Sequence, residues 1–323
     1  ANACTGDQGM TDAIKMTTLT AEVLEIDPKD LIVASTGVIG VYMPMDKIEK
    51  GIKEIKGHLS EEGGTDASLA IMTTDTVNKE FAYEFELEGN TVRIGGMAKG
   101  SGMIHPNMAT MLGFLTTDAA ISKDALKDIF KDVIDDTFNM ISVDGDTSTN
   151  DMVCILANGE ARNPIIEKDT NNYFKFKEVV RKICEEMSIA IVNDGEGATK
   201  LLTIKIINAL TKEDAKKAAR SISTSSLVKT AFFGEDANWG RIITALGYSG
   251  AELDPSKCDI FLGKMMMAKQ GKAMIFDEEE ALKILKEREI EVVCNLNIGS
   301  EEAIAWTCDL SYEYIKINAE YRS

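Results

Sequence analysis

The sequence predicts an α/β protein of the layered α+β kind, with mixed and largely antiparallel sheets. Segments with a helical period alternate with short apolar or alternating segments, in blocks rather than in strict strand–helix–strand order. The 323 residues, 44% of them hydrophobic, are enough for a large core. The chain has 5 prolines and no internal repeat or low-complexity linker. These observations predict elements that pack together without a separating linker.

The first third of the chain is predicted to hold two helices and then a series of strands. Apolar residues repeat at helical spacing over 10–24 and 44–56. Apolar and polar residues alternate from Phe81 to Leu87, which indicates a strand with one face exposed to solvent. The continuously apolar run 31–35, followed by a Gly-rich turn, indicates a buried strand. The predicted strands of this part are 31–35, 67–74, 81–89, 91–98 and 109–117.

The remaining part alternates helices with strands. The clearest helix is 123–141, where apolar residues recur at helical spacing and Ser122 is the predicted N-cap. A polar turn then leads into a buried strand at 152–157. Further predicted helices cover 174–190, 211–227, 238–247 and 277–288. Further predicted strands cover 201–207, 258–262, 291–298 and 311–318.

The charge and cysteine content exclude several classes of protein. Lys and Arg number 35 against 53 Asp and Glu, a net charge of −18, and the positive charges are scattered. A nucleic-acid or anionic-membrane surface needs clustered Lys and Arg, so we expect neither partner. There is no apolar run of membrane-spanning length and no signal-peptide pattern. The 6 cysteines stand far apart, which favours reduced thiols in a cytoplasmic protein over disulfides or a metal site.

Two polar segments invite ligand-binding interpretations that the residues alone do not support. The Gly-rich run 95–102 lacks the order of a phosphate-binding loop, because Lys99 precedes the Gly-Ser pair. It is either a surface turn or a place where backbone and a lone cation approach a ligand. The acidic run 143–151 lacks the remaining ligands of a calcium loop, so Asx turns are favoured, with magnesium a weaker alternative.

Two further Gly-containing turns carry candidate chemistry. Thr36 and Gly37 follow the apolar run 31–35, where backbone N–H groups and a hydroxyl could stabilise an oxyanion. A plain tight turn explains the same glycines equally well. Glu196 lies between two glycines before a strand, and it is either a solvated loop residue or a group that orients a substrate.

Thr110 stands in an apolar, strand-like run of the segment HPNMATMLGFLTTDA. The chain has only 2 His, so few residues could serve as the general base of an ordinary hydroxyl–His–Asp arrangement. Core packing is one interpretation, because β-branched residues are common in strands. The alternative is a nucleophile whose own α-amine, freed by a cut between Ala109 and Thr110, is the base. Such an amine has a pKa near ~8, which suits a general base.

Seven motifs occur in one order along the whole chain, and on them the sequence resembles a known family. They are NACTGDQG, STGVIG, GMAKGSGMIHPNMATML, SVDGDTSTND, NDGEGATK, FGEDANWGRI and INAEYRS. The family is the ornithine acetyltransferases, also called glutamate N-acetyltransferases, of arginine biosynthesis. Its members carry several tens of residues before the first motif, so we expect the sequence to lack that segment.

The resemblance implies an N-terminal-nucleophile-like acetyltransferase fold and a self-cleaving precursor. The α chain would be residues 1–109 and the β chain residues 110–323. Thr110 would take an acetyl group from N2-acetylornithine and pass it to glutamate through an ester, by ping-pong chemistry. Thr36 and Gly37 match the oxyanion hole of the family. The matched substrate contacts are Thr73 (with Thr74 as a one-residue ambiguity), Lys99, Thr110, Glu196, Asn318 and Ser323.

Residue chemistry fits these implied contacts. Lys99 suits the α-carboxylate that acetylornithine and glutamate share, and Glu196 suits the δ-amine of the ornithine arm. The C-terminal residues, which include Asn318 and Ser323, would fold back into the site, with 314–319 as a strand-like segment. The resemblance also implies two α and two β chains and no cofactor, with acetyl-CoA as a second acetyl donor in some members. Two alternatives stay open: a related Thr-nucleophile amidohydrolase or aminopeptidase, and an uncut, inactive binding protein.

Overall fold

Two β-sheets form the centre of the computed structural model, which describes residues 1–105 and 111–320. The first sheet has the strand order β1-β2-β3-β5, and the second has the order β4-β11-β6-β10-β7-β8-β9. The strands are β1 (Lys79–Leu87), β2 (Asn90–Lys99), β3 (Leu112–Thr117), β4 (Ile141–Ser142), β5 (Met152–Ala157), β6 (Leu201–Ala209), β7 (Asp259–Leu262), β8 (Met265–Lys269), β9 (Lys272–Ala273), β10 (Glu289–Asn295) and β11 (Glu301–Cys308). Three neighbouring pairs are parallel and the others antiparallel, so the predicted mixed, largely antiparallel α/β class is confirmed.

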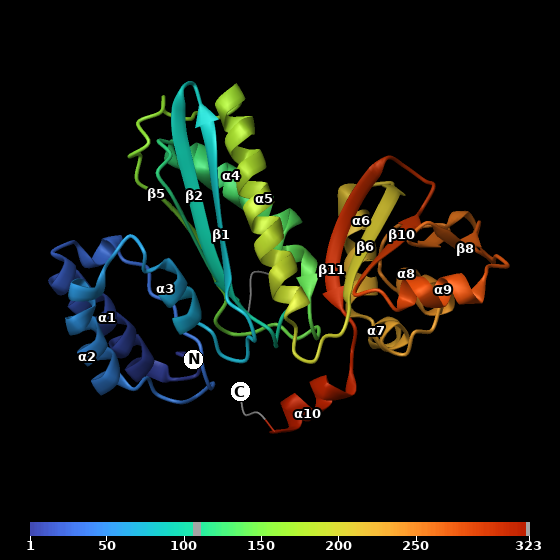
Figure 1. Ribbon diagram of the computed structural model, residues 1–323, viewed down its shortest axis with the longest axis horizontal. Helices are drawn as coiled ribbons and strands as arrows, with labels where there is room; N and C mark the ends of the chain where they lie inside the picture. The colour runs from blue at the N-terminus through green and yellow to red at the C-terminus, as the bar shows by residue number, and fades with distance from the viewer. Residues whose placement is uncertain (106–110, 321–323) are drawn as a thin grey trace.

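Helices surround and separate the two sheets (Figure 1). The α-helices are α1 (Gly6–Leu24), α2 (Met45–Ile55), α3 (Gly64–Ala70), α4 (Lys123–Asp136), α5 (Asn171–Asn193), α6 (Lys212–Thr224), α7 (Ser226–Phe233), α8 (Trp239–Gly247), α9 (Glu278–Leu285) and α10 (Tyr312–Glu320). Short 3₁₀ turns are η1 (Pro28–Asp30), η2 (Lys56–His58), η3 (Phe138–Met140) and η4 (Pro255–Lys257). Ser122 is the N-cap of α4 as predicted, although its buried hydroxyl makes no capping hydrogen bond.

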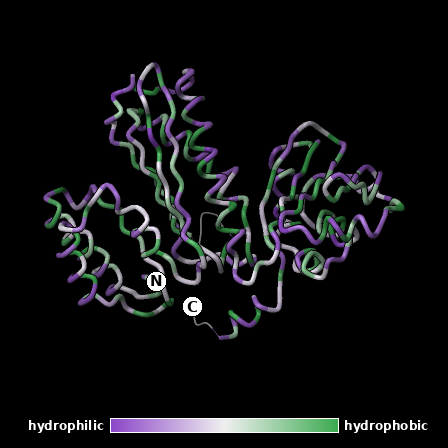
Figure 2. Tube along the Cα trace, in the orientation of Figure 1, coloured by the Kyte–Doolittle hydropathy of each residue, from purple (hydrophilic) through white to green (hydrophobic). Residues whose placement is uncertain are grey.

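Helix α5 lies at the centre of the molecule and joins the two sheets. It packs against α4 and β1 and β2 on one side and against β11 on the other. Its apolar residues Phe176, Ile183 and Met187 are fully buried, since the helix is covered on several faces. Figure 2 shows the hydrophobic stretches that run along the strands and along this helix. Burial of such side chains contributes roughly 1.5–3 kcal/mol each, so α5 fixes how the two sheets are placed.

Along the chain, the predicted cleavage point falls between β2 and β3, two strands of the first sheet. β2 and β3 pair in antiparallel register from Ile94↔Thr117 to Lys99↔Leu112. The strand before residue 109 and the strand after residue 110 therefore share six residue pairs. The predicted division into 1–109 and 110–323 separates two neighbouring strands of one sheet, so cut halves would stay joined by its hydrogen bonds.

Two strands predicted in the first third are wrong. Residues 31–35 pair with no strand among the described residues, and Ile32 and Val33 are 56% and 38% exposed. Residues 67–74 begin instead within helix α3. An apolar run becomes a strand only where another strand lies beside it, and α3 is rich in the good helix former alanine.

The last predicted strand is also wrong, and a strand before it was missed. Residues 312–318 of this predicted strand belong to helix α10, whereas 301–308 form β11, which pairs with β6 and β4. Short segments with β-branched residues fit either period, so pairing with β6 decides which one becomes the strand. α10 returns below the sheets toward the N-terminal region (Figure 1). The chain end still folds back, but as a helix.

The predicted helix 123–141 ends at Asp136, where a 3₁₀ turn and β4 follow. The predicted helix 211–227 is divided into α6 and α7 at Ser225, whose side chain caps α7. No helix among the described residues is long and apolar enough to cross a membrane.

Candidate active site

One pocket brings together six residues that the sequence motifs singled out. It lies where the ends of β2 and α5 meet the 35–40 turn and helix α10. The predicted residues that line it are Thr36, Gly37, Thr73, Lys99, Glu196 and Asn318. The other lining residues are Ala1, Ile39, Thr74, Gly102, Met103, Ser148, Thr149 and Asn150. Since the six predicted residues come from five separate segments, only the folded chain makes the pocket.

Lys99 is the buried cation of the pocket. It is the last residue of β2, is 6% exposed, and donates a hydrogen bond of 2.7 Å to the Thr73 hydroxyl. Thr74, the alternative to Thr73, bonds instead to the Ser101 hydroxyl at 2.7 Å. The geometry therefore connects Thr73, rather than its neighbour, with Lys99. A partly desolvated ammonium in this position is suited to a ligand carboxylate.

A network of alternating charges holds Lys99 in place. Asp75 lies 3.7 Å from the Lys99 ammonium and 2.8 Å from that of Lys79. Lys79, which is 1% exposed, also contacts Asp194 at 2.6 Å. Asp194 is the C-cap of α5 and is two residues from Glu196. The network thus links the Lys99 side of the pocket to the Glu196 side, and its two cations balance its two carboxylates.

Asp75 is the best-satisfied carboxylate of this network. It accepts hydrogen bonds from Lys79 at 2.8 Å and from the backbone N–H groups of Gly100 at 2.6 Å and Thr73 at 3.1 Å. Burial alone would raise the pKa of Asp75, but these donors and the charge of Lys99 hold it below its ordinary value. Burial lowers the pKa of Lys99, as does the charge of Lys79, and Asp75 opposes that change.

Glu196 and Asn318 meet on the opposite side of the pocket. Glu196 is 9% exposed, and its carboxylate accepts a hydrogen bond of 2.8 Å from the Asn318 amide. Its backbone N–H donates to Ser101 at 2.8 Å, so the 194–197 turn is tied to the end of β2. A side chain at Gly102 would place its Cβ 2.4 Å from the Glu196 carboxyl. Glycine there lets Glu196 lie over the backbone.

Thr36 and Gly37 form an exposed turn at the edge of the pocket. Gly37 has φ of +140°, a conformation that side chains rarely adopt. The turn is held by a hydrogen bond of 2.9 Å from Gly40 to Ala3 and by the Asn150 amide, 3.4 Å from the Ser35 hydroxyl. A glycine turn of this kind can present N–H groups to a developing negative charge.

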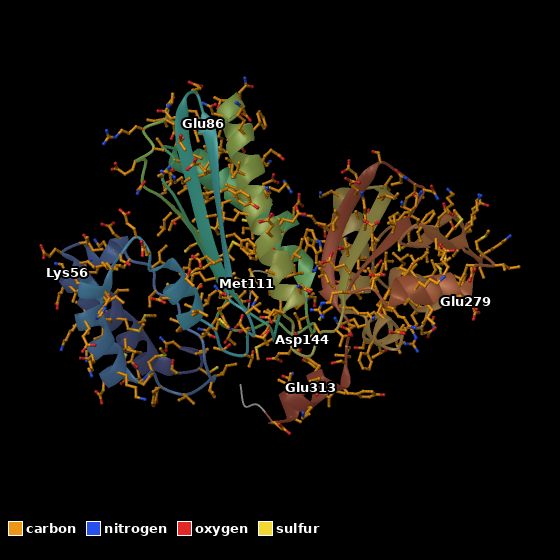
Figure 3. The ribbon with its side chains drawn as sticks, viewed as in Figure 1. Lys56, Glu86, Met111, Asp144, Glu279 and Glu313 are labelled. Atoms are coloured by element: carbon orange, nitrogen blue, oxygen red, sulfur yellow. The ribbon has the colours of Figure 1, made fainter. Side chains whose placement is uncertain are left out.

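The acidic run 143–151 forms part of the pocket wall, which motif reasoning missed. Asp144 accepts hydrogen bonds from the backbone N–H groups of Met103 at 2.6 Å and Ile104 at 2.9 Å, and from Tyr314 at 3.2 Å. It therefore ties the segment before residue 106 to helix α10. Figure 3 shows Asp144 and Met111 near the ends of the strands, above the helix that carries Glu313. The sequence did hold a signal for this wall, because the run 143–151 has more Asp, Ser, Thr and Asn side chains than a single turn needs.

Three predicted site residues lie outside the described residues. They are Ala109, Thr110 and Ser323. The buried residues Ile104 and Met111 lie on either side of the gap in the description. Among the residues that the structure describes, no group of three His, Cys, Asp or Glu side chains could hold a metal ion.

Together the fold and pocket define an enzyme-like site for a small molecule that carries both a carboxylate and an amine. A buried cation faces one side, a carboxylate the other, and a glycine turn lies at the edge. The ArgJ family model matches residues 1–323, so the chain belongs to the ArgJ family. The resemblance to the arginine-biosynthesis acetyltransferases, inferred from the motifs, is thereby confirmed.

Individual relatives agree with this assignment. The chain is 54% identical over 323 residues to the "Arginine biosynthesis bifunctional protein ArgJ" of Symbiobacterium thermophilum, covering 100% of this chain and 80% of that protein. It is 50% identical over 327 residues to the protein of the same name from Caldanaerobacter subterraneus subsp. tengcongensis, covering 100% and 81%. The crystal structure of the Bacillus halodurans protein of that name is 43% identical, with a TM-score of 0.64. It covers 66% of this chain and 100% of its own.

Proposed function

We propose that this chain is a self-cleaving acetyltransferase of arginine biosynthesis, which moves the acetyl group of N2-acetylornithine to glutamate. The observation that carries the proposal is the pocket, which unites Thr36, Gly37, Lys99, Glu196 and Asn318 in one place. Membership of the ArgJ family supports the same activity. The products are ornithine and N-acetylglutamate.

The substrates fit the charges of the pocket. Acetylornithine and glutamate share an α-carboxylate, which Lys99 would bind together with the Thr73 hydroxyl. Glu196 would bind the δ-ammonium of ornithine, with Asn318 holding its carboxylate in place. A charged pair at each end fixes the acetyl-bearing nitrogen between them, which supplies the orientation that acyl transfer needs.

Acetyl transfer would take place at Thr110 in two halves. The Thr110 hydroxyl attacks the acetyl carbonyl carbon, its proton passes to the α-amine of Thr110, and Thr36 and Gly37 stabilise the oxyanion. The C–N bond then breaks, the proton passes to the leaving nitrogen, and ornithine departs from an acetyl-Thr110 ester. In the second half, the amine of glutamate attacks this ester, and Thr110 regains its proton.

The same hydroxyl would first free its own amine. Thr110 attacks the carbonyl carbon of Ala109, the peptide nitrogen is protonated and leaves, and water hydrolyses the resulting ester. The share of this chain that the Bacillus halodurans chain covers, 66%, equals the share that residues 110–323 make up. A relative that begins at the cut would give this value, which supports the proposed cleavage.

Mass spectrometry of the purified protein tests the cleavage and the nucleophile together. Two fragments, residues 1–109 and 110–323, are expected from the unmodified chain, with acetyl transfer from N2-acetylornithine to glutamate. Thr110→Ala should stay uncut and inactive, whereas Thr116→Ala, an exposed threonine of β3, should be cut normally. A processed Thr110→Ala protein would refute the assignment.

The proposal extends to the assembly, the donor and the compartment. The α and β chains stay joined through the β2–β3 pair, and we propose two copies of each, which light scattering would report as twice the mass of one precursor. Acetyl-CoA is proposed as a second donor, to be tested beside acetylornithine in the same assay. The described cysteines are all free thiols, which supports a cytoplasmic location.

A further inference from the structure

The acidic run 143–151 has no chemical role in the proposed acetyl transfer. With its neighbours it forms a connecting segment, residues 142–152, that joins the two sheets. The segment begins at Ser142 of β4, which pairs with β11 of the second sheet. It ends at Met152 of β5, which pairs with β3 of the first sheet. Both ends of the connecting segment are therefore fixed by strand pairing.

The first half of the connecting segment holds the residues that precede the predicted cut. The Val143 N–H donates a hydrogen bond of 2.7 Å to the Ile104 carbonyl. The Thr147 hydroxyl donates to the His105 carbonyl at 2.9 Å, and the Ser142 hydroxyl lies 3.3 Å from Nδ1 of His105. Contacts with main-chain carbonyls and with a side chain thus fix the last described residues before the cut.

Asp144 adds contacts to the N–H groups of the same stretch. Its carboxylate accepts hydrogen bonds from two successive backbone N–H groups, those of Met103 at 2.6 Å and Ile104 at 2.9 Å. Met103 has φ of +55°, a left-handed conformation that non-glycine residues rarely adopt. Successive N–H groups that converge on one anion stabilise such a backbone. Asp144 therefore fixes the direction in which the chain leaves Ile104 toward the cut.

The other end of the connecting segment holds the residues that follow the cut. The Met152 N–H donates a hydrogen bond of 2.9 Å to the carbonyl of Met111, which is 2% exposed. Parallel pairing of β3 with β5 starts at the next pair, Leu112↔Met152. Asp144 and Met111, both labelled in Figure 3, thus belong to the contacts on the two sides of residues 106–110. One segment holds both described flanks of the predicted cut.

Self-cleavage and acetyl transfer depend differently on the flank before the cut. In cleavage, the Thr110 hydroxyl displaces its own nitrogen, which leaves protonated, from the Ala109 carbonyl carbon. Water then hydrolyses the ester to a carboxylate and the free hydroxyl. The electrophile is therefore part of the chain that Asp144 directs. In acetyl transfer the electrophile is the acetyl carbonyl of the substrate, so misplacement of this flank should slow the cut and spare the transfer.

We propose that Asp144 is a positioning residue for self-cleavage, which fixes Met103 and Ile104 so that the chain brings the Ala109 carbonyl to the Thr110 hydroxyl. It acts through the backbone that it holds. The inference rests on the proposed function, because it concerns the cut that frees the Thr110 amine. Once the cut is made, the flank before it is no longer bonded to Thr110, and acetyl transfer does not need Asp144.

The rate at which the full chain cuts itself tests the inference. The precursor is made by cell-free translation, and denaturing gels follow its conversion into residues 1–109 and 110–323. Asp144→Ala should be cut about 10- to 100-fold more slowly than the unmodified chain, because two backbone N–H groups lose their acceptor. Asp146→Ala, which changes an exposed Asp of the same run, is the matched control and should be cut at the unmodified rate.

Three further readings separate positioning from general damage to the fold. The cut fraction of Asp144→Ala, collected after long incubation, should transfer acetyl groups with an unchanged kcat. Met103→Gly, added to Asp144→Ala, should speed the cut about fivefold, because glycine adopts positive φ without a steric cost. Tyr314→Phe removes only the contact between Asp144 and helix α10, so it should be cut at the unmodified rate.

An unmodified rate of cutting in Asp144→Ala would overturn the inference. So would an equal loss of kcat in its cut fraction, or a failure of Met103→Gly to speed its cut. If circular dichroism shows that Asp144→Ala does not fold, Asp144→Asn takes its place. It keeps the shape of the side chain but offers one acceptor oxygen to two N–H groups, so its cut should be roughly tenfold slower. An unmodified rate in that variant would equally overturn the inference.

The same experiment distinguishes a failure of the inference from a failure of the proposed function. If the unmodified chain stays uncut, the proposed function fails and the inference fails with it. If the unmodified chain and Asp144→Ala are cut equally fast and both transfer acetyl groups, only the inference fails. If the unmodified chain is cut but transfers no acetyl group, the proposed activity fails, and slow cutting of Asp144→Ala that Met103→Gly relieves still supports the inference.

Discussion

The two sides of the pocket are built differently. The charged wall, defined as Lys99, which lines the pocket, and the network of Asp75, Lys79 and Asp194 that holds it, is almost closed to water and joined by ion pairs of 2.6–3.7 Å. The rim, defined as Thr36, Gly37 and Asn318, is exposed. Helix α10, which carries Asn318, has no buried residue.

This difference shows that one part of the pocket is rigid, whereas another part lets the substrate enter. Buried charges are tolerated only when each is paired, so the charged wall has one arrangement and fixes where a ligand carboxylate lies. Exposed groups on a turn and a surface helix cost little to move, so a substrate can enter past them. The charged wall should therefore carry stability and affinity, whereas the rim should carry little of either.

The largest effect should follow from breaking the charged wall. Lys79→Met leaves Asp75 and Asp194 without their shared cation, so we expect a loss of about 3–5 kcal/mol in the free energy of unfolding. Lys316→Met, which breaks the exposed pair with Glu313 on α10, should cost less than ~1 kcal/mol. Urea denaturation measures both, and equal losses would remove the distinction between wall and rim.

The next largest difference between the charged wall and the rim should appear in substrate affinity. Lys99→Met removes a charge-assisted contact of about 1.5–3 kcal/mol, so KM for both substrates should rise roughly 10- to 100-fold. Asn318→Ala removes a neutral donor at the rim worth about 0.5–1.5 kcal/mol, so KM should rise only about 2- to 10-fold. Steady-state kinetics of the cleaved enzyme measures both, and a larger effect at Asn318 would reverse the comparison.

Acid should weaken the charged wall through Asp75. Its pKa is lowered in the folded state, so its contribution to stability is present above the unfolded value of 3.8 and is lost as pH falls through the lower folded value. The unmodified chain should thus exceed Asp75→Asn in stability at pH 7 by about 1–3 kcal/mol, and less at pH 3. Denaturation at the two pH values tests this, and a constant difference would contradict it.

The smallest effect should come from Gly102, between the two sides. An added methyl would displace only the carboxyl end of the Glu196 side chain, so Gly102→Ala should change stability by less than ~1 kcal/mol. It should still raise KM for acetylornithine several-fold and leave KM for glutamate nearly unchanged, because glutamate lacks the δ-ammonium. Gly51→Ala, with open space around its Cα, is the matched control.

The sequence by itself determined the class of fold and most helices, and its motifs supplied the candidate residues of the site. Amphipathic helices such as α4 and α5 can be predicted from the sequence, because the helical spacing of their apolar residues is a local property of the chain. The resemblance carried by the seven motifs predicted Thr36, Lys99, Glu196 and Asn318 as site residues, and the structure places these four in one pocket.

Only the tertiary structure decided which segments form strands and which groups surround each buried carboxyl. Residues 301–308 form strand β11 because β6 lies beside them, whereas residues 312–320 have no such neighbour and form helix α10. The local sequence pattern does not show which segment will have this neighbour. Likewise, Asp75 and Asp151 are the same residue type, and the sequence does not tell them apart. Asp75 accepts hydrogen bonds from Lys79 and Gly100, whereas at Asp151 the Met111 N–H and the charge of Lys99 do not offset the effect of burial on its pKa, because burial and hydrogen bonding depend on segments far apart in the chain.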